Sequence, residues 1–367
     1  MKYFILAGEK SGDLHGSNLV KQINLIDAKA EIIGWGGDQM NSAGVNILVH
    51  HQELAIMGVL GVLKNLFRLK SLFNLFSNQI REFKPDTIIF IDYGGFNLKA
   101  AKIAKQGGFH TQFYIAPKVW AWNTGRALKI KRDIDFLYTI LPFETAFYAK
   151  FNMKVDYVGN PLCDSISNYD FNSNFKVDQQ ISRPYIALLP GSRMSELKHV
   201  LPTMLKTIKN FPEFDFILAG ANHIPNNIYE SYCAGYPVKI VKGLTYDVLK
   251  NANAALVCSG TATLETALLN CPQVVVFRFS KLSYFIGKLL IKVKYISLVN
   301  LILNKPVLEE LIQDEFNESK IVSALSKILS GPKRLEMIQS YAALKIKVGN
   351  SGASERTAKL IVSRTQN

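Results

Sequence analysis

The residues best suited to chemistry lie near the middle of the chain, where the apolar run 186–189 meets Pro190-Gly191-Ser192-Arg193. Four apolar residues followed by this turn predict a buried strand that ends sharply, and Met194 to Leu197 can begin a helix. Such a corner presents unpaired backbone N–H groups and the positive end of a helix dipole, which together favour a phosphate. The Arg193 guanidinium could grip a diphosphate, although an ordinary turn with a solvated arginine explains the pattern equally well.

A second loop suited to phosphate is Ser259-Gly260-Thr261, which follows the apolar run 254–257. Its hydroxyl groups and its place at a predicted helix N-terminus favour an anion. Glu265, one helical turn further on, could accept hydrogen bonds from both hydroxyl groups of a ribose. Together with the corner at 191–193, these residues form a set that a nucleoside diphosphate fits.

The first half of the chain offers a candidate general base, Asp92, which follows the apolar run 87–91 and precedes Tyr93-Gly94-Gly95. Ligands of open α/β sheets bind at the carboxyl ends of the strands, so a carboxylate at that position can take part in proton transfer. A helix N-cap is the common alternative for an aspartate before a helix. A glycine-rich loop, 8–13, follows the first predicted strand and lets a ligand approach the backbone closely.

These residues need a framework that brings them together, and the sequence supplies a repeated strand-then-helix pattern. The predicted strands are 3–7, 32–36, 87–91, 111–116, 136–140, 186–189, 214–219, 238–241 and 254–257. Strands that alternate with helices predict a parallel, doubly wound α/β sheet. The pattern occurs on both sides of a polar stretch, and so predicts two sheets.

The polar stretch begins at Gly159-Asn160-Pro161, is rich in Asn, Ser and Asp, and ends at Arg183-Pro184. We therefore expect a first domain over 1–160, a linker over 161–184 and a second domain over 185–340. The basic segment 341–367 is expected to form a last helix that packs back on the first domain. Two α/β domains joined in this way leave a cleft, which is a usual place for ligands.

The composition and charge of the chain indicate which classes of binding partner to expect. The chain has 367 residues, 48% of them hydrophobic, and a net charge of +14, which is typical of a globular protein that meets phosphate-rich partners. Nucleic acid is disfavoured because the α/β pattern contains no recognition helix or RNA-binding motif. The four cysteines lie far apart and no His or Cys cluster has metal-ligand spacing, so no metal is expected.

Two amphipathic segments, 57–76 and 281–304, carry apolar residues on the arc that a soluble helix keeps polar. In the first, Leu60 and Phe67 lie beside Lys64 and Arg68, and in the second, Lys288 and Lys292 belong to a basic stripe. Such helices can dip into a membrane interface, where lysine and arginine meet lipid phosphates. Burial against the rest of the protein explains them equally well. No uncharged apolar run reaches the length of a membrane span.

Ten short segments recur in an order that is specific to one family. They are A-G-E-K-S-G-D (7–13), G-G-D-Q-M (36–40), Met57-Gly58, Pro85-Asp86, I-D-Y-G-G-F-N (91–97), V-W-A-W (119–122), L-P-F-E (141–144), V-G-N-P-L (158–162), L-P-G-S-R (189–193) and S-G-T-A-T-L-E (259–265). Nearly end to end, the chain resembles the lipid-A-disaccharide synthases. It departs from them at Gly94-Gly95, where the family commonly has Pro-Asp, and at Lys118, where a serine is frequent. Any role of that second aspartate is therefore absent here.

The resemblance implies two Rossmann-like domains in the GT-B arrangement and an inverting hexosyltransferase. The implied reaction joins a UDP-linked 2,3-diacylglucosamine to 2,3-diacylglucosamine 1-phosphate. It forms the β-1,6-linked disaccharide of lipid A biosynthesis and releases UDP. Asp92 would deprotonate the acceptor's 6-hydroxyl, Arg193 would stabilise the departing UDP, and an acidic residue such as Glu309 would help to hold the nucleotide. The other cleft residues implied are Glu9, Ser11, Gly12, Asp13, Asn97 and Asn300.

The resemblance further implies a cytoplasmic enzyme that binds peripherally to the anionic surface of the inner membrane. It implies no cofactor and no nucleic-acid partner. It leaves the oligomeric state open between a monomer and a homodimer. The alternative is a UDP-N-acetylglucosamine 2-epimerase, or another UDP-sugar transferase on the same scaffold, which would need no lipid-facing surface.

Overall fold

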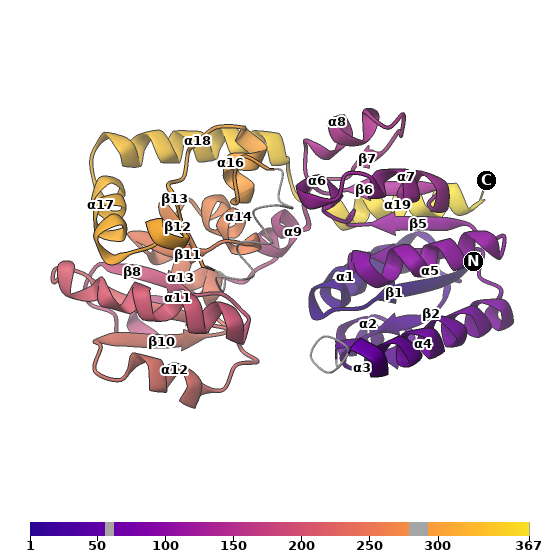
Figure 1. Ribbon diagram of the computed structural model, residues 1–367, viewed down its shortest axis with the longest axis horizontal. Helices are drawn as coiled ribbons and strands as arrows, with labels where there is room; N and C mark the ends of the chain where they lie inside the picture. The colour runs from indigo at the N-terminus through magenta and orange to yellow at the C-terminus, as the bar shows by residue number, and fades with distance from the viewer. Residues whose placement is uncertain (56–61, 279–292, 367) are drawn as a thin grey trace. The chain divides into compact units, whose positions relative to one another are not determined.

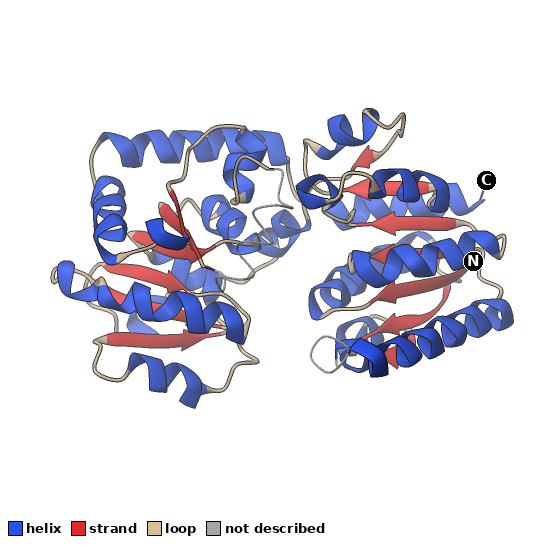
Figure 2. Cartoon of the chain, viewed as in Figure 1, coloured by secondary structure: helices blue, strands red, loops and turns tan. Residues whose placement is uncertain are grey.

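The computed structural model describes residues 1–55, 62–278 and 293–366. The chain divides into two compact units, one formed by Met1–Asp164 with Asn350–Asn367 and the other by Ser165–Gly349. Each unit is a parallel sheet covered by helices on both faces (Figures 1 and 2). The predicted fold class, two doubly wound α/β sheets, is confirmed.

The first unit contains a seven-stranded sheet in the order β3-β2-β1-β4-β5-β6-β7. Its strands are β1 (Lys2–Ala7), β2 (Glu31–Gly36), β3 (Asn46–His50), β4 (Thr87–Ile91), β5 (Thr111–Tyr114), β6 (Phe136–Thr139) and β7 (Asp156–Tyr157). The central strands β1 and β4 pair in parallel, and their apolar residues are buried on both faces. This burial explains why these strands are continuous hydrophobic runs in the sequence.

Helices cover the two faces of this sheet in separate sets. The helices are α1 (Lys10–Ile26), α2 (Asp38–Ser42), α3 (His51–Ala55), α4 (Val62–Phe83), α5 (Gly94–Gln106), α6 (Val119–Trp122), α7 (Arg126–Asp133), α8 (Glu144–Ala149) and α19 (Ala353–Gln366), while the chain passes from the first unit to the second within α9 (Pro161–Ser167). Helices α4, α5 and α7 pack their apolar residues into one core, while α1 and α19 build the core on the opposite face. The first unit is therefore completed by the last helix of the chain.

Asp164 fastens α19 to this unit. Its carboxylate accepts hydrogen bonds from the backbone N–H groups of Gly352 (2.5 Å), Ala353 (3.1 Å) and Ser354 (3.0 Å). These are donors that a helix N-terminus leaves without partners, and a carboxylate there is stabilised by the helix dipole. The preceding helix, α18 (Pro332–Val348), belongs to the second unit and ends at Gly349, whose φ is +79°.

The second unit contains a six-stranded parallel sheet in the order β10-β9-β8-β11-β12-β13. Its strands are β8 (Tyr185–Leu189), β9 (Asp215–Gly220), β10 (Val238–Lys242), β11 (Ala254–Cys258), β12 (Gln273–Phe277) and β13 (Glu310–Ile312). The helices are α10 (Phe175–Asp178), α11 (Met194–Lys206), α12 (Asn226–Cys233), α13 (Thr245–Asn251), α14 (Thr261–Leu268), α16 (Leu298–Leu303), α17 (Glu318–Leu329) and α18. The order of strands reverses between β8 and β11, which is where open α/β sheets bind ligands.

The segment 161–184, which we expected to link two domains, contains α9 and α10. Much of it belongs to the second unit, because the Asp247 carboxylate accepts hydrogen bonds from the Tyr169 hydroxyl (2.5 Å) and from the backbone N–H of Asn172 (2.9 Å). Asp247 is buried in α13, so these bonds satisfy a charge that would otherwise be costly.

Candidate active site

The corner after β8 has the predicted strand-turn-helix geometry, but its donors are already used. The backbone N–H groups of Ser192 and Arg193 donate to the Glu196 carboxylate at 2.9 and 3.2 Å. Gly191 has φ +105°, and a side chain there would meet the same carboxylate, since a Cβ would lie 2.4 Å from Glu196 Oε2. Glu196 therefore stands where we expected a phosphate, as the third residue of α11 capping its own helix.

Arg193 itself remains accessible to a ligand. Its side chain is 75% exposed, and one guanidinium nitrogen lies 3.4 Å from Glu196 Oε1. An ion pair this exposed contributes little to stability, so the guanidinium can turn to an anionic ligand at small cost. Of the expected corner residues, Arg193 is thus the strongest candidate for binding a diphosphate.

The loop after β11 offers the second group of donors. Ser259 donates its hydroxyl to the carbonyl of Ile296 (3.0 Å), whereas Gly260 and Thr261 are exposed at the start of α14. The first N–H groups of a helix have no partner within that helix, and the dipole adds positive potential. Because β8 and β11 pair in parallel, with Leu189 beside Val257, this loop and Arg193 leave from neighbouring strand ends.

Glu265 lies on α14 and is hydrogen-bonded to the hydroxyl of Tyr246 at 2.9 Å. Burial raises the pKa of Glu265, and the Tyr246 hydroxyl partly offsets this by donating to the carboxylate. The bond occupies Oε1, and a carboxylate has room for further donors. The tyrosine thus orients a half-buried acceptor, which is the chemistry expected for a ribose hydroxyl.

Two other expected binding residues have structural contacts instead. Asn300 is 1% exposed, and its side chain bonds both the N–H and the carbonyl of Leu308 (2.8 and 2.9 Å). Glu309 points to the surface and pairs with Lys327 on α17 at 3.4 Å. We therefore assign Asn300 to holding the loop before β13, and Glu309 to a surface ion pair.

The neighbouring acid, Glu310, points into the protein and has a structural role. Its carboxylate accepts hydrogen bonds from the N–H groups of Ile296 and Ser297, both at 2.9 Å, and from the side chain of Asn300 at 2.9 Å. It thereby fixes the 296–300 turn, whose carbonyl at Ile296 holds Ser259. Adjacent residues of a strand point to opposite faces, and a Glu-Glu pair gives no sign of which one points inward.

In the first unit, Asp92 sits on a strained backbone at the carboxyl end of β4. Asp92 and Tyr93 have φ values of +47° and +48°, and two successive non-glycine residues in the left-handed region are unusual. Asn97 supports them, because its Nδ2 donates to the carbonyl of Asp92 (2.8 Å) and to that of Ile91 (3.2 Å). Strain of this kind is characteristic of functional sites.

Burial raises the pKa of Asp92, while the positive charge of Lys118 and the backbone N–H of Tyr93 act in the opposite direction. A carboxylate whose pKa is raised is a better proton acceptor than an ordinary aspartate. Asn97 is entirely buried, so we assign it to positioning Asp92 rather than to contact with a substrate.

The predicted loop 8–13 is shorter than expected, because α1 begins at Lys10, and the turn before it lies beside Tyr93, the residue after Asp92. A Cβ on Gly8 would lie 2.1 Å from the Tyr93 ring, so only glycine fits there. Burial raises the pKa of the Tyr93 hydroxyl, and the charge of Glu9, the N-cap residue of α1, raises it further. Ser11 is exposed, and Gly12 packs against Ala7. Gly8 thus lets the backbone between β1 and α1 approach the Tyr93 ring, next to Asp92 in the chain.

Asp13 differs from what we expected of it. It is 2% exposed, and its carboxylate accepts hydrogen bonds from the backbone N–H groups of Gly37 (2.8 Å), Gln39 (3.1 Å) and Met40 (3.1 Å). It therefore fixes the turn between β2 and α2. The motifs A-G-E-K-S-G-D and G-G-D-Q-M, far apart in the sequence, are joined by this one side chain.

Comparisons with known proteins agree with this architecture. The model of the family described as "Lipid-A-disaccharide synthetase" matches residues 3–364. The chain belongs to this family. The lipid-A-disaccharide synthase of Geobacter metallireducens is 36% identical over 98% of this chain and 96% of its own length. That of Syntrophus aciditrophicus is 37% identical over the same shares. As a member of the family, the chain is a glycosyltransferase of lipid A biosynthesis.

Solved structures show the same fold at low sequence identity. A UDP-GlcNAc 2-epimerase from Neisseria meningitidis, solved with UDP-GlcNAc bound, superimposes with a TM-score of 0.70 at 12% identity, over 99% of this chain and all of its own. The calicheamicin glycosyltransferase CalG4 gives a TM-score of 0.64 at 12% identity, covering 100% of this chain and 98% of its own. The fold is therefore shared by epimerases and transferases, and the sequence relatives place this chain with the synthases.

Two further family motifs meet inside the first unit. Glu144 of L-P-F-E is fully buried and accepts hydrogen bonds from Trp120 Nε1 (3.0 Å) and from the backbone N–H groups of Ile140 (3.2 Å) and Leu141 (3.0 Å). Burial raises the pKa of Glu144 to about 7, although these donors and Lys118 lower it. No local pattern predicts this link, because the two side chains are twenty-four residues apart in the chain.

The structure describes only part of the two segments expected to touch lipid. Leu60, Lys288 and Lys292 lie outside the described residues, as does the side chain of Lys64. On α4, Phe67 is 80% exposed, and the Arg68 guanidinium donates to the carbonyl of Glu53 at 2.9 Å. Among the described helices, none combines the length and apolar character needed to span a bilayer. The described residues likewise contain no cluster of His, Cys, Asp or Glu fit for a metal ion.

Proposed function

We propose that the protein transfers 2,3-diacylglucosamine from its UDP-linked donor to 2,3-diacylglucosamine 1-phosphate. The products are a β-1,6-linked disaccharide 1-phosphate and UDP. The observation that carries the proposal is the full-length match to the lipid-A-disaccharide synthetase family. The residues at the strand ends supply groups that this chemistry needs.

The donor's nucleotide is assigned to the second unit. Arg193 and the exposed start of α14 leave from adjacent strands, and Glu265 lies one turn along that helix. We assign the diphosphate to Arg193 and to the N–H groups around Gly260 and Thr261, and the ribose to Glu265. The Ser192 N–H joins them only if Glu196 moves away, since it donates to that carboxylate.

The acceptor's 6-hydroxyl is assigned to Asp92. As its oxygen forms a bond to the anomeric carbon of the donor, Asp92 takes the proton, and the bond from that carbon to the diphosphate oxygen breaks. The electron pair of that bond leaves with UDP. Arg193 and the α14 dipole then stabilise the charge that develops on the leaving group. Attack from the face opposite to UDP inverts the anomeric carbon.

Contact with an anionic membrane surface, on its cytoplasmic side, is part of the proposal. Phe67 and Leu75 of α4 are 80% and 40% exposed, and the chain carries a net charge of +14. Exposed apolar residues beside cations favour the interface of an anionic bilayer. Flotation with vesicles tests this contact, and sedimentation decides between a monomer and a homodimer.

The decisive experiment measures UDP release from UDP-diacylglucosamine, with and without diacylglucosamine 1-phosphate. Acceptor-dependent release is expected from the wild type, whereas Arg193→Ala should lower turnover about 10²-fold or more. Arg183→Ala is a matched control. Arg183 precedes β8, the strand that Arg193 follows, is 49% exposed and pairs with Asp215 at 3.2 Å.

If the wild type releases no UDP in an acceptor-dependent manner under any detergent condition, the proposed reaction is wrong. If Arg193→Ala behaves like Arg183→Ala, the reaction stands, but Arg193 does not stabilise the leaving group.

A further inference from the structure

The first unit has a basic groove that none of the roles assigned above uses. It has a volume of about 350 Å³ and lies between α5 and α7, which cover the same face of the sheet (Figure 1). Its lining residues are Gly94, Gly95, Leu98, Lys99, Lys102, Arg126, Lys129, Arg132 and Asp133. Five of these side chains are cations and one is an anion.

The sequence spacing explains why these cations meet. Lys99 and Lys102 are three residues apart on α5, and so are Arg126, Lys129 and Arg132 on α7. Residues at this spacing share one face of a helix. The opposite faces are apolar, with Ala100, Ala104 and Ile130 among the residues buried against the sheet. Packing two amphipathic helices side by side therefore turns both basic faces toward one groove.

Most of this charge is not neutralised. Arg132 Nε and one terminal nitrogen lie 2.7 and 2.6 Å from the Asp133 carboxylate, so the charges of Arg132 and Asp133 neutralise each other. Within the ranges that the structure describes, no carboxylate lies at ion-pair distance from Lys99, Lys102 or Lys129. The Arg126 guanidinium stacks on the Trp122 ring at 4.3 Å. Four cations are thus left to face an anion.

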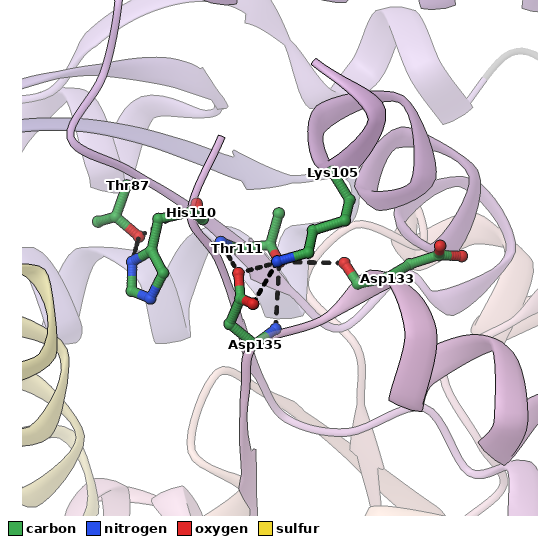
Figure 3. A network of polar contacts seen from close by, with 6 residues as sticks. All are labelled: Thr87, Lys105, His110, Thr111, Asp133 and Asp135. Carbon is green, nitrogen blue, oxygen red and sulfur yellow. Dashed lines mark hydrogen bonds and ion pairs between the residues drawn. The ribbon is translucent and has the colours of Figure 1, made fainter. Parts of the chain in front are cut away.

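The two walls are fixed to each other beyond the groove. Figure 3 shows that Lys105, in the last turn of α5, pairs with Asp135 in the segment that follows α7. Thr111 holds the Asp135 side of this contact, since its backbone N–H donates to the Asp135 carboxylate (3.0 Å) and its hydroxyl donates to the carbonyl of Asp133 (3.0 Å). The groove is therefore held by buried and half-buried contacts before any ligand arrives.

We propose that this groove binds the phosphate monoester of the acceptor lipid. The inference rests on the proposed function, which places the phosphates of the donor in the second unit and leaves the acceptor's own phosphate without a partner. The groove begins at Gly94 and Gly95, two and three residues after Asp92, so a sugar whose 6-hydroxyl reaches Asp92 can extend toward it. A dianionic monoester is the ligand that several lysines favour.

Exposed apolar residues near the groove fit the rest of such a lipid. Trp122, the last residue of α6, is 41% exposed and stacks on Arg126, and Leu128 of α7 is 59% exposed. An acylated sugar phosphate presents a charged group and hydrocarbon close together, and this surface offers cations and apolar side chains in the same arrangement.

The test is the double variant Lys99→Ala/Lys129→Ala, which removes one cation from each wall. Lys21→Ala/Lys29→Ala is the charge-matched control, since both lysines are exposed in the first unit and neither lines the groove. Acceptor-dependent UDP release is measured at saturating donor, with diacylglucosamine 1-phosphate and with diacylglucosamine that lacks the phosphate.

The groove variant should raise the KM for the phosphorylated acceptor roughly tenfold or more. With the acceptor that lacks phosphate, the variant and the wild type should perform alike, because the interaction is already missing. An equal loss with both acceptors would overturn the proposal, since it would indicate a general defect.

Two further measurements separate the remaining outcomes. Titration with glucosamine 1-phosphate reports binding without turnover, so wild-type binding that the groove variant loses supports the groove even if the proposed reaction fails. Flotation with phosphatidylglycerol vesicles tests the bilayer as the source of phosphate. An unchanged KM together with lost vesicle binding would make the groove a membrane contact and refute the acceptor site.

Discussion

Replacement of Asp92 by asparagine tests the proposed base with little disturbance to the fold. The residue has φ +47°, a conformation that asparagine adopts as readily as aspartate. Its main contacts use the backbone, since its N–H donates to the carbonyl of Tyr114 (3.1 Å) and its carbonyl accepts from Asn97 (2.8 Å). The free energy of unfolding should therefore change by no more than about 0.5 kcal/mol.

The effect on catalysis should be large. A positioned general base contributes about 10²- to 10⁴-fold, which corresponds to about 3 to 5 kcal/mol of transition-state stabilisation. Asp92→Asn should thus lower turnover by that factor, with the affinity for UDP unchanged. Burial raises the pKa of Asp92 above its ordinary value of 3.8, and only the deprotonated form accepts a proton. Wild-type kcat/KM should therefore fall as the pH is lowered through this pKa.

The assay is acceptor-dependent UDP release over a range of pH, combined with urea unfolding of each variant. Asp86→Asn is the matched control, because Asp86 precedes the opposite end of the same strand and accepts the N–H of Lys2 at 2.8 Å. If Asp92→Asn keeps turnover within about threefold of the wild type while folding normally, Asp92 is an organiser of its loop, and the reasoning from burial and strain is refuted.

Three other changes have defined outcomes. Asn97→Ala removes the donor to the carbonyls of Ile91 and Asp92. The substitution should lower the free energy of unfolding by about 1 to 3 kcal/mol and reduce turnover. Full activity would contradict the positioning role. Glu265→Gln should weaken UDP binding about 10- to 100-fold in calorimetry, and an unchanged affinity would exclude the ribose contact. Glu144 has a pKa of about 7 in the fold against an ordinary 4.5, so the folded state binds the proton more tightly and stability should fall as the pH rises between these values. The difference is about 3 kcal/mol, and urea unfolding at pH 5 and pH 8 should show it in the wild type and not in Glu144→Gln.

Local patterns predicted most of the strands but not all of them. Strands β3, β7, β12 and β13 were not predicted. Two of them, β7 and β13, have two and three residues, too few for a periodic signal, and each forms an edge of its sheet. The strand β12 carries three consecutive valines, a composition that by itself is typical of a buried strand.

The corner at 191–193 shows where sequence reasoning stops. Its glycine, its turn and its helix start were all predicted, because each depends on residues that are neighbours in the chain. The pattern could not show that Glu196, three residues after Arg193, turns back and takes the N–H groups of Ser192 and Arg193. The choice between an internal carboxylate and an external phosphate is a competition between two anions for the same donors.

Short segments of the chain are enough to predict the fold class, the strand ends that hold Asp92 and Arg193, and the family, because each depends on hydrophobic period, turn residues or motif order. Tertiary structure decided which polar groups remain for a ligand. Asp13 and Asn300 are used within the fold, while Lys99 and Lys129 meet across a groove. The physical reason is that a buried polar group must find a partner, and that partner is set by distances between residues far apart in the chain.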